Sequence, residues 1–137
     1  MSIVKTTLKA VLLLIAIPLF LGGLYYFSKS NRERAELWFN IQNLFPQGSQ
    51  QEQWCFDRAV KADPTYAKAW MQKSVSHTKR GQYAEGFRLL NKAVELEPAE
   101  YLGYRGYVKL YMLRDYDGAI EDFMRLDALT PKVRDAP

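Results

Sequence analysis

The chain has 137 residues, a formal net charge of +4, and a composition that is 48% hydrophobic and 25% charged. This length allows one small domain with an appendage, and the composition is that of a folded chain rather than a disordered one. The single cysteine excludes an internal disulfide framework and a cysteine-based metal cluster, and the lack of any Lys/Arg block beyond residue 28 argues against nucleic-acid binding.

An uncharged apolar run occupies residues 10–28, after a short N-terminal tail over residues 1–9. As a helix that rises about 1.5 Å per residue, this run nearly matches a bilayer hydrocarbon core of about 30 Å. Lysines precede the run, and "YYF" near its end suits an interfacial aromatic belt. We expect an uncleaved single-pass anchor, kinked at Pro18. A cleaved signal peptide is the alternative, although its apolar region is shorter, about 7–15 residues.

The orientation of the anchor is difficult to predict from charge. Basic residues flank the run on both sides, at Lys5 and Lys9 before it and at Lys29, Arg32 and Arg34 after it. The positive-inside rule therefore discriminates little between the two orientations. We expect a signal-anchor arrangement, with the N-terminal tail inside and the soluble domain on the exported, periplasm-like side.

Three similar phrases, "DRAVKADP", "NKAVELEP" and "MRLDALTP", end at Pro64, Pro98 and Pro131, which are 34 and 33 residues apart. Self-similarity at a fixed period indicates a repeat array. Each proline ends a helix because it lacks an N–H and restricts the residue before it. After a juxtamembrane linker over residues 29–34, we therefore expect helical hairpins over residues 35–64, 65–98 and 99–131, followed by a tail over residues 132–137.

The middle unit has the clearest pattern. Helical periodicity predicts one helix over about residues 66–79 and a second over about residues 83–96, joined by the turn "KRGQY". We expect Trp70, Leu90 and Ala93 to be core positions. One such hairpin cannot bury both of its apolar stripes, so neighbouring hairpins must cover them.

This middle unit resembles a tetratricopeptide (TPR) repeat, with its pattern W-x₂-L-G-x₂-Y, A-x₃-F and P. Trp70 takes the tryptophan place, Gly86 the alanine, Leu90 the phenylalanine and Pro98 the proline. In the last unit, "AIEDF" matches the A-x₃-F part of the pattern, and the turn between the two helices is one residue shorter. The first unit is degenerate, and its sequence "SQQE", residues 49–52, predicts a capping box.

The resemblance implies an all-α fold, in which an N-terminal transmembrane helix is followed by an α-solenoid of about three TPR-like hairpins. No helix is recognisable after Pro131 to cap the stack. We therefore expect the outer face of the last helix, with Ile120, Phe123 and Leu126, to be partly uncovered.

The resemblance also implies a concave face, lined by the first helix of each hairpin, that holds a segment of a partner protein. The partner-binding residues that it predicts are Phe39, Asn43, Lys68, Met71, Gln72, Val75, Lys79, Arg105, Lys109 and Met112. We expect Arg105 and Lys109 to be surface positions whose replacement leaves the fold intact.

One known mode of this family clamps the C-terminal carboxylate of chaperones with fixed lysines and asparagines. Only Asn43 matches that set. The other places hold Phe39, Gln72, Leu102 and Gly106. We therefore do not expect chaperone-tail binding.

The sequence lacks the parts of a catalytic site, so we predict that the protein is not an enzyme. It has no phosphate loop, nucleophile elbow or metal signature, and His77 is its only histidine. We expect His77 and Cys55 to be packed in structural positions. Tyr104, Tyr107 and Tyr111 are interpreted first as a packing stripe and, as the second alternative, as a recognition surface. No cofactor, metal or small-molecule substrate is predicted.

The function predicted is that of a membrane-anchored TPR adaptor with protein partners, an accessory or assembly subunit of a membrane-associated complex. The alternative is a permanent structural subunit that packs through its anchor and last helix into a larger membrane complex or a homo-oligomer. A third hypothesis, an enzyme of an unrecognised type, has little support in the sequence.

Overall fold

The structure of the chain, a computed structural model, describes residues 2–130, with side chains from residue 11 onward. The regular secondary structure of the described residues is entirely helical, without a strand, so the all-α prediction is confirmed. The helices are α1 (Ser2–Ser28), α2 (Asn31–Ile41), α3 (Gln50–Ala62), α4 (Ala67–Lys79), α5 (Tyr83–Leu96), α6 (Pro98–Val108) and α7 (Tyr116–Leu129), with a 3-10 turn η1 (Gln42–Leu44) and a π turn η2 (Lys109–Leu113). The predicted stop at Pro131 and the tail over residues 132–137 lie outside the described part.

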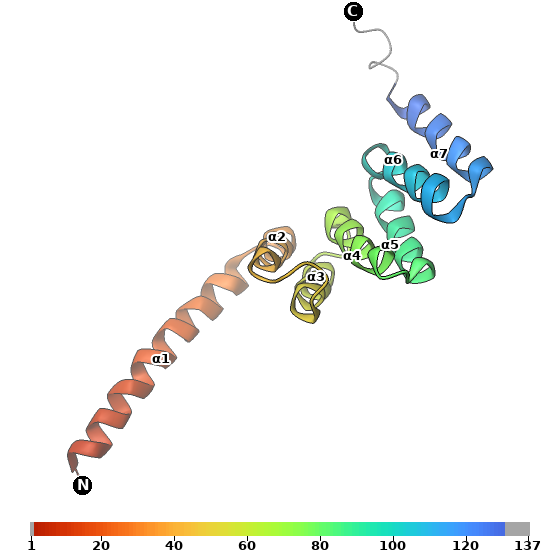
Figure 1. Cartoon of the computed structure of the whole chain (residues 1–137). Helices are drawn as coiled ribbons and strands as arrows, with labels where there is room; N and C mark the ends of the chain where they lie inside the picture. The colour runs from red at the N-terminus through yellow and green to blue at the C-terminus, as the bar shows by residue number, and fades with distance from the viewer. Residues whose placement is uncertain (1, 131–137) are drawn as a thin grey trace, which may run out of the picture.

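Helix α1 projects away from the other helices (Figure 1). It begins at Ser2 and continues through Pro18, so residues 2–9, which we expected as a separate tail, are helical and continuous with the apolar run. Its stretch from Val11 to Ser28 is long and apolar enough to span a membrane, and none of that stretch is buried against the rest of the protein. Length and composition thus agree with the predicted anchor.

The linker between α1 and α2 is much shorter than the predicted 29–34, because α2 begins at Asn31. Ser30 caps α2: its Oγ accepts from the Glu33 N–H at 3.2 Å, and Glu33 Oε2 accepts from the Ser30 N–H at 2.9 Å. This capping box fixes the first turn of α2 immediately after the apolar helix.

The remaining helices form three consecutive pairs, α2 with α3, α4 with α5, and α6 with α7, which we call the first, second and third hairpins (Figure 1). Neighbouring hairpins meet through α3 with α4 and through α5 with α6. The two helices predicted for the middle unit begin and end within one residue of the prediction. The helical periodicity of the sequence was therefore sufficient to place the ends of these two helices.

The core lies at the boundaries between hairpins. One cluster joins the first and second hairpins and contains Ala35, Phe39, Phe56, Ala59, Tyr66 and Ala69. A second cluster joins the second and third hairpins and contains Ala67, Ala93, Val94, Tyr101 and Leu102. Leu90 and Ala93 are buried as predicted. Trp70 is only partly buried, because its Nε1 donates to the Pro64 carbonyl at the edge of the second cluster, at 2.9 Å.

The connection inside the hairpin is one residue shorter in the third hairpin than in the second, in line with the two repeat lengths: residues 80–82 separate α4 from α5, and residues 114–115 separate η2 from α7. Gly81, 17 residues before Pro98, has φ +75°, and Arg114, 17 residues before Pro131, has φ +56°. The third hairpin thus places an arginine where the second uses a glycine, in the left-handed region that favours glycine. Its α6 also ends in the π turn η2, which widens the helix just before the shortened connection.

Gly86 stands where the TPR pattern has alanine, and the second hairpin has no room for a side chain there. A Cβ at Gly86 would lie 3.0 Å from the Thr78 nitrogen and 3.1 Å from the Ser74 carbonyl oxygen, and would also meet Thr78 Oγ1. Helices α4 and α5 therefore cross more closely than an alanine allows.

The predicted capping box at Ser49 is half right. Ser49 Oγ accepts from the Glu52 N–H at 3.1 Å, as predicted. The Glu52 carboxylate, however, accepts from the Gly48 N–H at 2.6 Å, while the Ser49 N–H donates to the Pro46 carbonyl. Because the tight turn before α3 uses the Ser49 N–H, the N–H group that remains for the Glu52 carboxylate is that of Gly48, one residue earlier.

Candidate functional site

A pocket of about 570 Å³ lies between the first helix of the first hairpin and the first helix of the second. We call it the amide pocket. It is lined by Phe39, Asn40, Gln42, Asn43, Phe45, Gln47, Glu52, Lys68 and Gln72. Four of the ten predicted partner-binding residues, Phe39, Asn43, Lys68 and Gln72, thus come together from α2, η1 and α4.

Phe39 contributes to this pocket as a core residue rather than as a free surface residue. It is 8% exposed, and its ring lies 5.9 Å from that of Phe56 and 5.5 Å from that of Tyr66. The prediction that it lies off the packing stripe is therefore wrong, since α2 turns it toward α3 and α4. The Lys68 ammonium sits 5.0 Å from the centre of its ring, a cation–π arrangement.

Glu52 forms one side of the amide pocket, where hydrogen bonds fix its side chain. Its carboxylate is buried and accepts hydrogen bonds from the Gly48 N–H and from Ser76 Oγ, the latter at 3.2 Å. Gln47 accepts from the Lys79 ammonium at 3.0 Å. Lys79, another predicted residue, therefore reaches the edge of the same pocket from the end of α4.

The chemistry of the amide pocket suits main-chain groups of a peptide. Side-chain amides both donate and accept hydrogen bonds. Within residues 2–130, the side chains of Asn40 and Gln72 make no hydrogen bond, while Asn43 accepts only from its neighbour Gln42, at 2.6 Å. The pocket thus offers unused amide donors and acceptors beside an apolar floor.

Three other predicted residues lie outside this pocket. Met71 is half-buried against the cluster between the second and third hairpins, and Val75 is half-buried further along α4. Met112 is exposed in η2, at the far side of the third hairpin. The structure does not bring these three side chains together with the four in the amide pocket.

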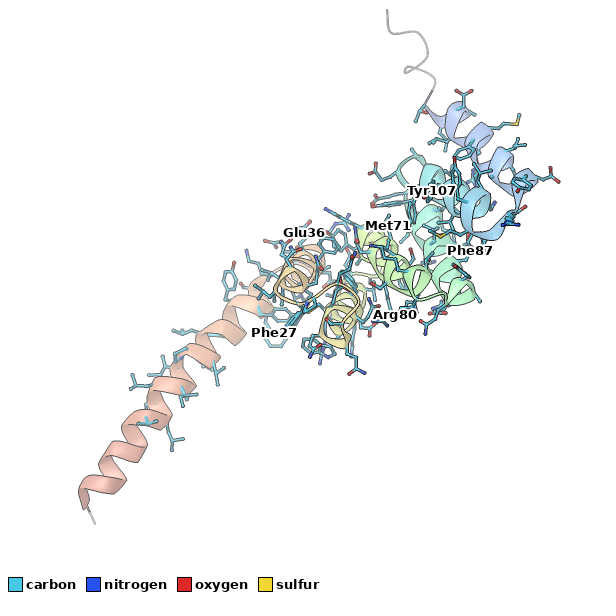
Figure 2. All side chains as sticks on the ribbon, in the orientation of Figure 1. Phe27, Glu36, Met71, Arg80, Phe87 and Tyr107 are labelled. Atoms are coloured by element: carbon cyan, nitrogen blue, oxygen red, sulfur yellow. The ribbon has the colours of Figure 1, made fainter. Side chains whose placement is uncertain are left out.

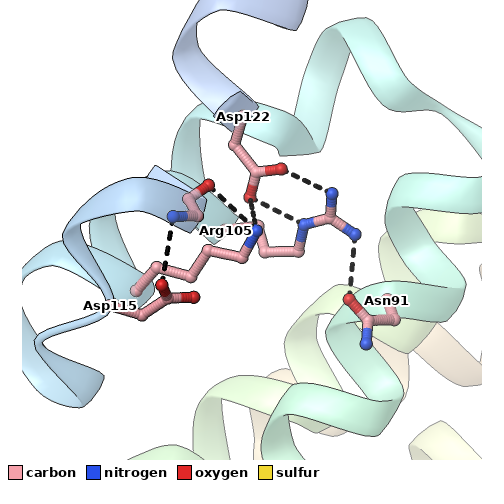
Figure 3. Close-up of polar contacts among 6 residues, drawn as sticks. Asn91, Arg105, Asp115 and Asp122 are labelled. Atoms are coloured by element: carbon pink, nitrogen blue, oxygen red, sulfur yellow. Dashed lines mark hydrogen bonds and ion pairs between the residues drawn. The ribbon is translucent and has the colours of Figure 1, made fainter. Parts of the chain in front are cut away.

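Arg105 and Lys109 do not behave as the predicted surface residues. Arg105 forms a two-point ion pair with Asp122 of α7 and donates through Nη1 to Asn91 of α5 at 2.9 Å (Figure 3). Lys109 lies 3.0 Å from the same carboxylate and also donates to the Gly118 carbonyl at 3.0 Å. Their charged groups tie α5, α6 and α7 together, so the expectation that they are free surface positions is wrong. We now expect that replacing them weakens the fold.

The Asp122 carboxyl shows the strength of this arrangement. Burial by itself raises the pKa of Asp122, but the hydrogen bonds and positive charges of Arg105 and Lys109 outweigh it and leave the pKa below its usual range. Sequence reasoning missed this residue. A signal was available, because Asp122 stands inside the apolar stripe formed by Ala119, Phe123 and Leu126.

The outer face of α7 is apolar and exposed, as predicted for Ile120 and Phe123. Ile120 is 57% and Met124 68% exposed, whereas Leu126 is partly buried against the neighbouring core cluster. Tyr104 and Tyr107 of α6 and Tyr111 of η2 lie in a row, with ring centres 6.3 and 4.8 Å apart. Tyr107 and Tyr111 are exposed, so this row is less of a packing stripe than predicted.

The single histidine and cysteine are in structural positions. His77 is half-buried and its Nδ1 lies 2.8 Å from Gln82 Oε1 across the turn. Cys55 is fully buried, and burial raises the pKa of its thiol. In the part of the chain that the structure describes, no three His, Cys, Asp or Glu side chains are grouped to hold a metal ion.

Comparison with known proteins gives a partial similarity. No protein-family profile matches the chain. It is 31% identical over 72 residues to Hsp70-Hsp90 organizing protein 2 of Arabidopsis thaliana, and 30% identical over 70 residues to Hsp70-Hsp90 organizing protein 3 of the same plant. These stretches cover 51% and 50% of this chain, but the chain spans only 12% of the length of either relative. The relatives contain TPR repeats, so the resemblance noted in the sequence is supported over about half of the chain.

Proposed function

We propose that the protein is an adaptor, anchored in a membrane by α1, that binds an extended segment of a partner protein in the amide pocket. The observation that carries this proposal is the pocket itself, where Phe39, Asn43, Lys68 and Gln72 meet between two successive hairpins. We interpret the three hairpins as a short TPR-like solenoid, because their helix bounds and spacing follow the repeat and distant relatives contain it.

The proposed ligand is an extended segment because of what lines the pocket. Amide side chains can pair with the N–H and C=O groups of an extended main chain without demanding a charged side chain. Phe45, which lines the same pocket and is only half-buried, offers a contact for one apolar side chain. We further propose that α1 holds the domain, and with it the partner, at the membrane surface on the exported side, where the protein acts as an accessory or assembly subunit of a membrane-associated complex.

We do not extend this proposal to the chaperones after which the two relatives are named. Two of the places that a carboxylate clamp needs are filled by Leu102 and Gly106, which are buried at the packing surfaces of α6. Lys68 is the only cation among the residues that line the amide pocket, and it lies over the Phe39 ring. A terminal carboxylate would therefore meet one lysine rather than a set of cations.

The test replaces Gln72 by arginine, which fills the amide pocket and adds a charge. The matched control is Gln51→Arg, at an exposed position on α3 away from the pocket. Both full-length variants are purified from membranes in mild detergent after cross-linking. We expect Gln72→Arg to retain less than about a tenth of the partner captured by the wild type, a loss of about 1.4 kcal/mol or more, while the control captures it normally. Equal capture by both variants would overturn the role of the pocket.

A second candidate function is favoured by the exposed face of α7. Ile120, Phe123 and Met124 leave a contiguous apolar surface on the last described helix, and such surfaces commonly mark an interface. In this account the protein is a permanent structural subunit that packs through α1 and α7 into a larger membrane complex or a homo-oligomer. A partner recovered at a fixed ratio that resists salt would favour it, while a substoichiometric and salt-sensitive partner favours the adaptor.

A further inference from the structure

A second pocket, of about 430 Å³, lies where α1 meets the first hairpin. We call it the junction pocket. It is lined by Tyr26, Phe27, Asn31, Arg34, Arg58, Lys61 and Ala62. Figure 2 shows Phe27 at the end of α1 that adjoins this hairpin. The pocket therefore opens at the point where the apolar helix gives way to the folded domain.

The aromatic residues beside this pocket attach α1 to the first hairpin. Trp38 Nε1 donates to the Tyr26 hydroxyl at 3.1 Å, and the Trp38 ring packs edge-on against that of Trp54 at 5.0 Å. These contacts join α1, α2 and α3. Because the linker is only two residues, the depth of the pocket relative to the membrane is set by α1.

The junction pocket carries three positive charges and no acidic residue. In the described part of the chain, Arg34, Arg58 and Lys61 form no ion pair. Nearby basic residues do: Lys29 pairs with Glu33 at 3.0 Å, and Arg32 pairs with Asp63 at 3.4 Å. The local carboxylates are thus already used, and the three cations of the pocket remain available to an anion.

The two arginines are oriented rather than free in solvent. The Arg34 guanidinium lies over the Tyr26 ring, 5.7 Å from its centre, and the Arg58 guanidinium lies over the Trp54 ring at 4.9 Å. Arg34 Nε is buried and has no hydrogen-bond partner. A buried donor without an acceptor is unfavourable, and the same holds for the amide of Gln53 outside the pocket, so the case for an anion rests on the three unpaired cations.

We propose that the junction pocket binds the phosphate of an anionic phospholipid headgroup, an inference that rests on α1 being the membrane anchor. Guanidinium groups match the geometry of phosphate oxygens, and stacking on an aromatic ring occupies their faces rather than their N–H edges. Arg34 uses one N–H on Asn31 Oδ1, within the pocket lining, and its other N–H groups and those of Arg58 have no acceptor among the described residues. Tyr26 and Phe27 lie at the end of the apolar span, at the level of the headgroups. Cations at that level attract anionic lipids.

The three positive charges of the junction pocket favour an anionic headgroup over a zwitterionic one. A zwitterionic headgroup brings its own cation into a pocket that already holds three, whereas a phosphatidylglycerol headgroup brings only a negative charge. The acyl chains of the same lipid can lie along the exposed apolar side of α1, including Leu24 and Phe27. A free phosphate ion lacks this second contact, so the lipid should bind more tightly than the ion.

The test uses the full-length chain in mild non-ionic detergent, with bound lipids counted by native mass spectrometry. Phosphatidylglycerol and phosphatidylcholine with the same acyl chains are compared, with inorganic phosphate as the non-lipid source. The pocket variant combines Arg34→Gln, Arg58→Gln and Lys61→Gln. The control variant combines Arg80→Gln, Lys92→Gln and Arg125→Gln, which removes the same charge from positions outside the pocket.

We expect the wild type and the control to prefer phosphatidylglycerol at least tenfold, and the pocket variant to lose that preference while keeping the helical circular-dichroism spectrum. A preference that survives in the pocket variant, a control that loses it equally, or inorganic phosphate that binds as tightly as the lipid would overturn the proposal. Carbonate extraction of the wild type from vesicles separates the two claims. Release by carbonate would contradict the anchor and the lipid site together, whereas a retained chain without lipid preference would contradict the lipid site alone.

Discussion

Arg105 on α6 and Asp122 on α7 form a two-point ion pair, with Nε–Oδ2 and Nη2–Oδ1 distances of 2.8 and 2.6 Å (Figure 3). The side chain of Asp122 is only 2% exposed, and Lys109 reaches the same carboxylate. Positions that the repeat resemblance assigns to a partner are therefore used to hold the third hairpin together.

Removal of Asp122 should destabilise the protein strongly. Asp122→Ala leaves two cations facing a buried space without a counter-charge, and breaking a buried ion pair from one side costs about 3–5 kcal/mol. Glu121→Ala, at the exposed neighbouring position on α7, should change the free energy of unfolding by no more than about 0.5 kcal/mol. Urea unfolding of the full chain in mild detergent measures both. Equal effects of the two substitutions would contradict the role given to the pair.

The same carboxylate predicts a dependence of stability on pH. The pKa of folded Asp122 lies below its ordinary value of 3.8, so the unfolded chain binds this proton more readily. Its contribution to stability is therefore complete above about pH 5 and is lost as the pH falls below about 4. The difference in unfolding free energy between the wild type and Asp122→Asn should be constant from about pH 7 to 5 and should shrink toward about pH 2. A difference that stays flat over the acid range would argue against this titration.

Much of the fold could be predicted from the sequence, because the helices of the second hairpin have a 3.6-residue periodicity, α4 ends just before the turn at Gly81, and α5 ends at Leu96, two residues before Pro98. The site was harder to predict. Position in a repeat indicates which face of a helix a residue occupies, but it does not indicate whether a neighbouring element supplies a buried partner. Lys68 and Gln72 reach the predicted pocket because α2 lies beside them, whereas Arg105 meets an aspartate that the repeat pattern does not contain.

The start of α1 and the burial of Phe39 show the same limit of prediction from sequence. The apolar run predicted the anchor but not that the helix would extend back to Ser2, because Lys5 and Lys9 end the uncharged stretch on which the prediction was based. Likewise, Phe39 was predicted as a surface position from its place in the repeat. Its burial depends on Tyr66, which belongs to the next hairpin.

The close crossing of α4 and α5 predicts an unusual response to a consensus substitution. Gly86→Ala restores the alanine of the TPR pattern, yet its Cβ would press on backbone atoms of Thr78 and Ser74, so we expect destabilisation by about 1–3 kcal/mol. Gly103→Ala on α6 is the control. Its Cβ would meet only the flexible end of Leu126, so higher helix propensity should stabilise it by up to about 1 kcal/mol. Thermal melting of both variants measures the difference, and a Gly86→Ala protein that melts higher would show that the helices can separate without cost.

The exposed face of α7 predicts self-association or docking in the structural-subunit account. Ile120→Glu and Met124→Glu place charges on this face at positions that are more than half exposed, so the fold should be kept. If the face is an interface, the paired variant should lose its complex in blue native electrophoresis, while Glu121→Gln should retain it. A complex of unchanged size in the paired variant would remove the observation that favours the second candidate function.

The adaptor account is tested most directly by a photo-cross-linking amino acid placed at Asn43, in the amide pocket, in the full-length chain in its native membrane. The control is the same amino acid at Gln51, which is exposed on α3 outside the pocket. We expect Asn43 to cross-link to one discrete partner protein, with the product reduced at least tenfold by Gln72→Arg, and Gln51 to give no such product. Cross-linking to that partner from Gln51 but not from Asn43, or a product that is insensitive to Gln72→Arg, would contradict binding in the amide pocket.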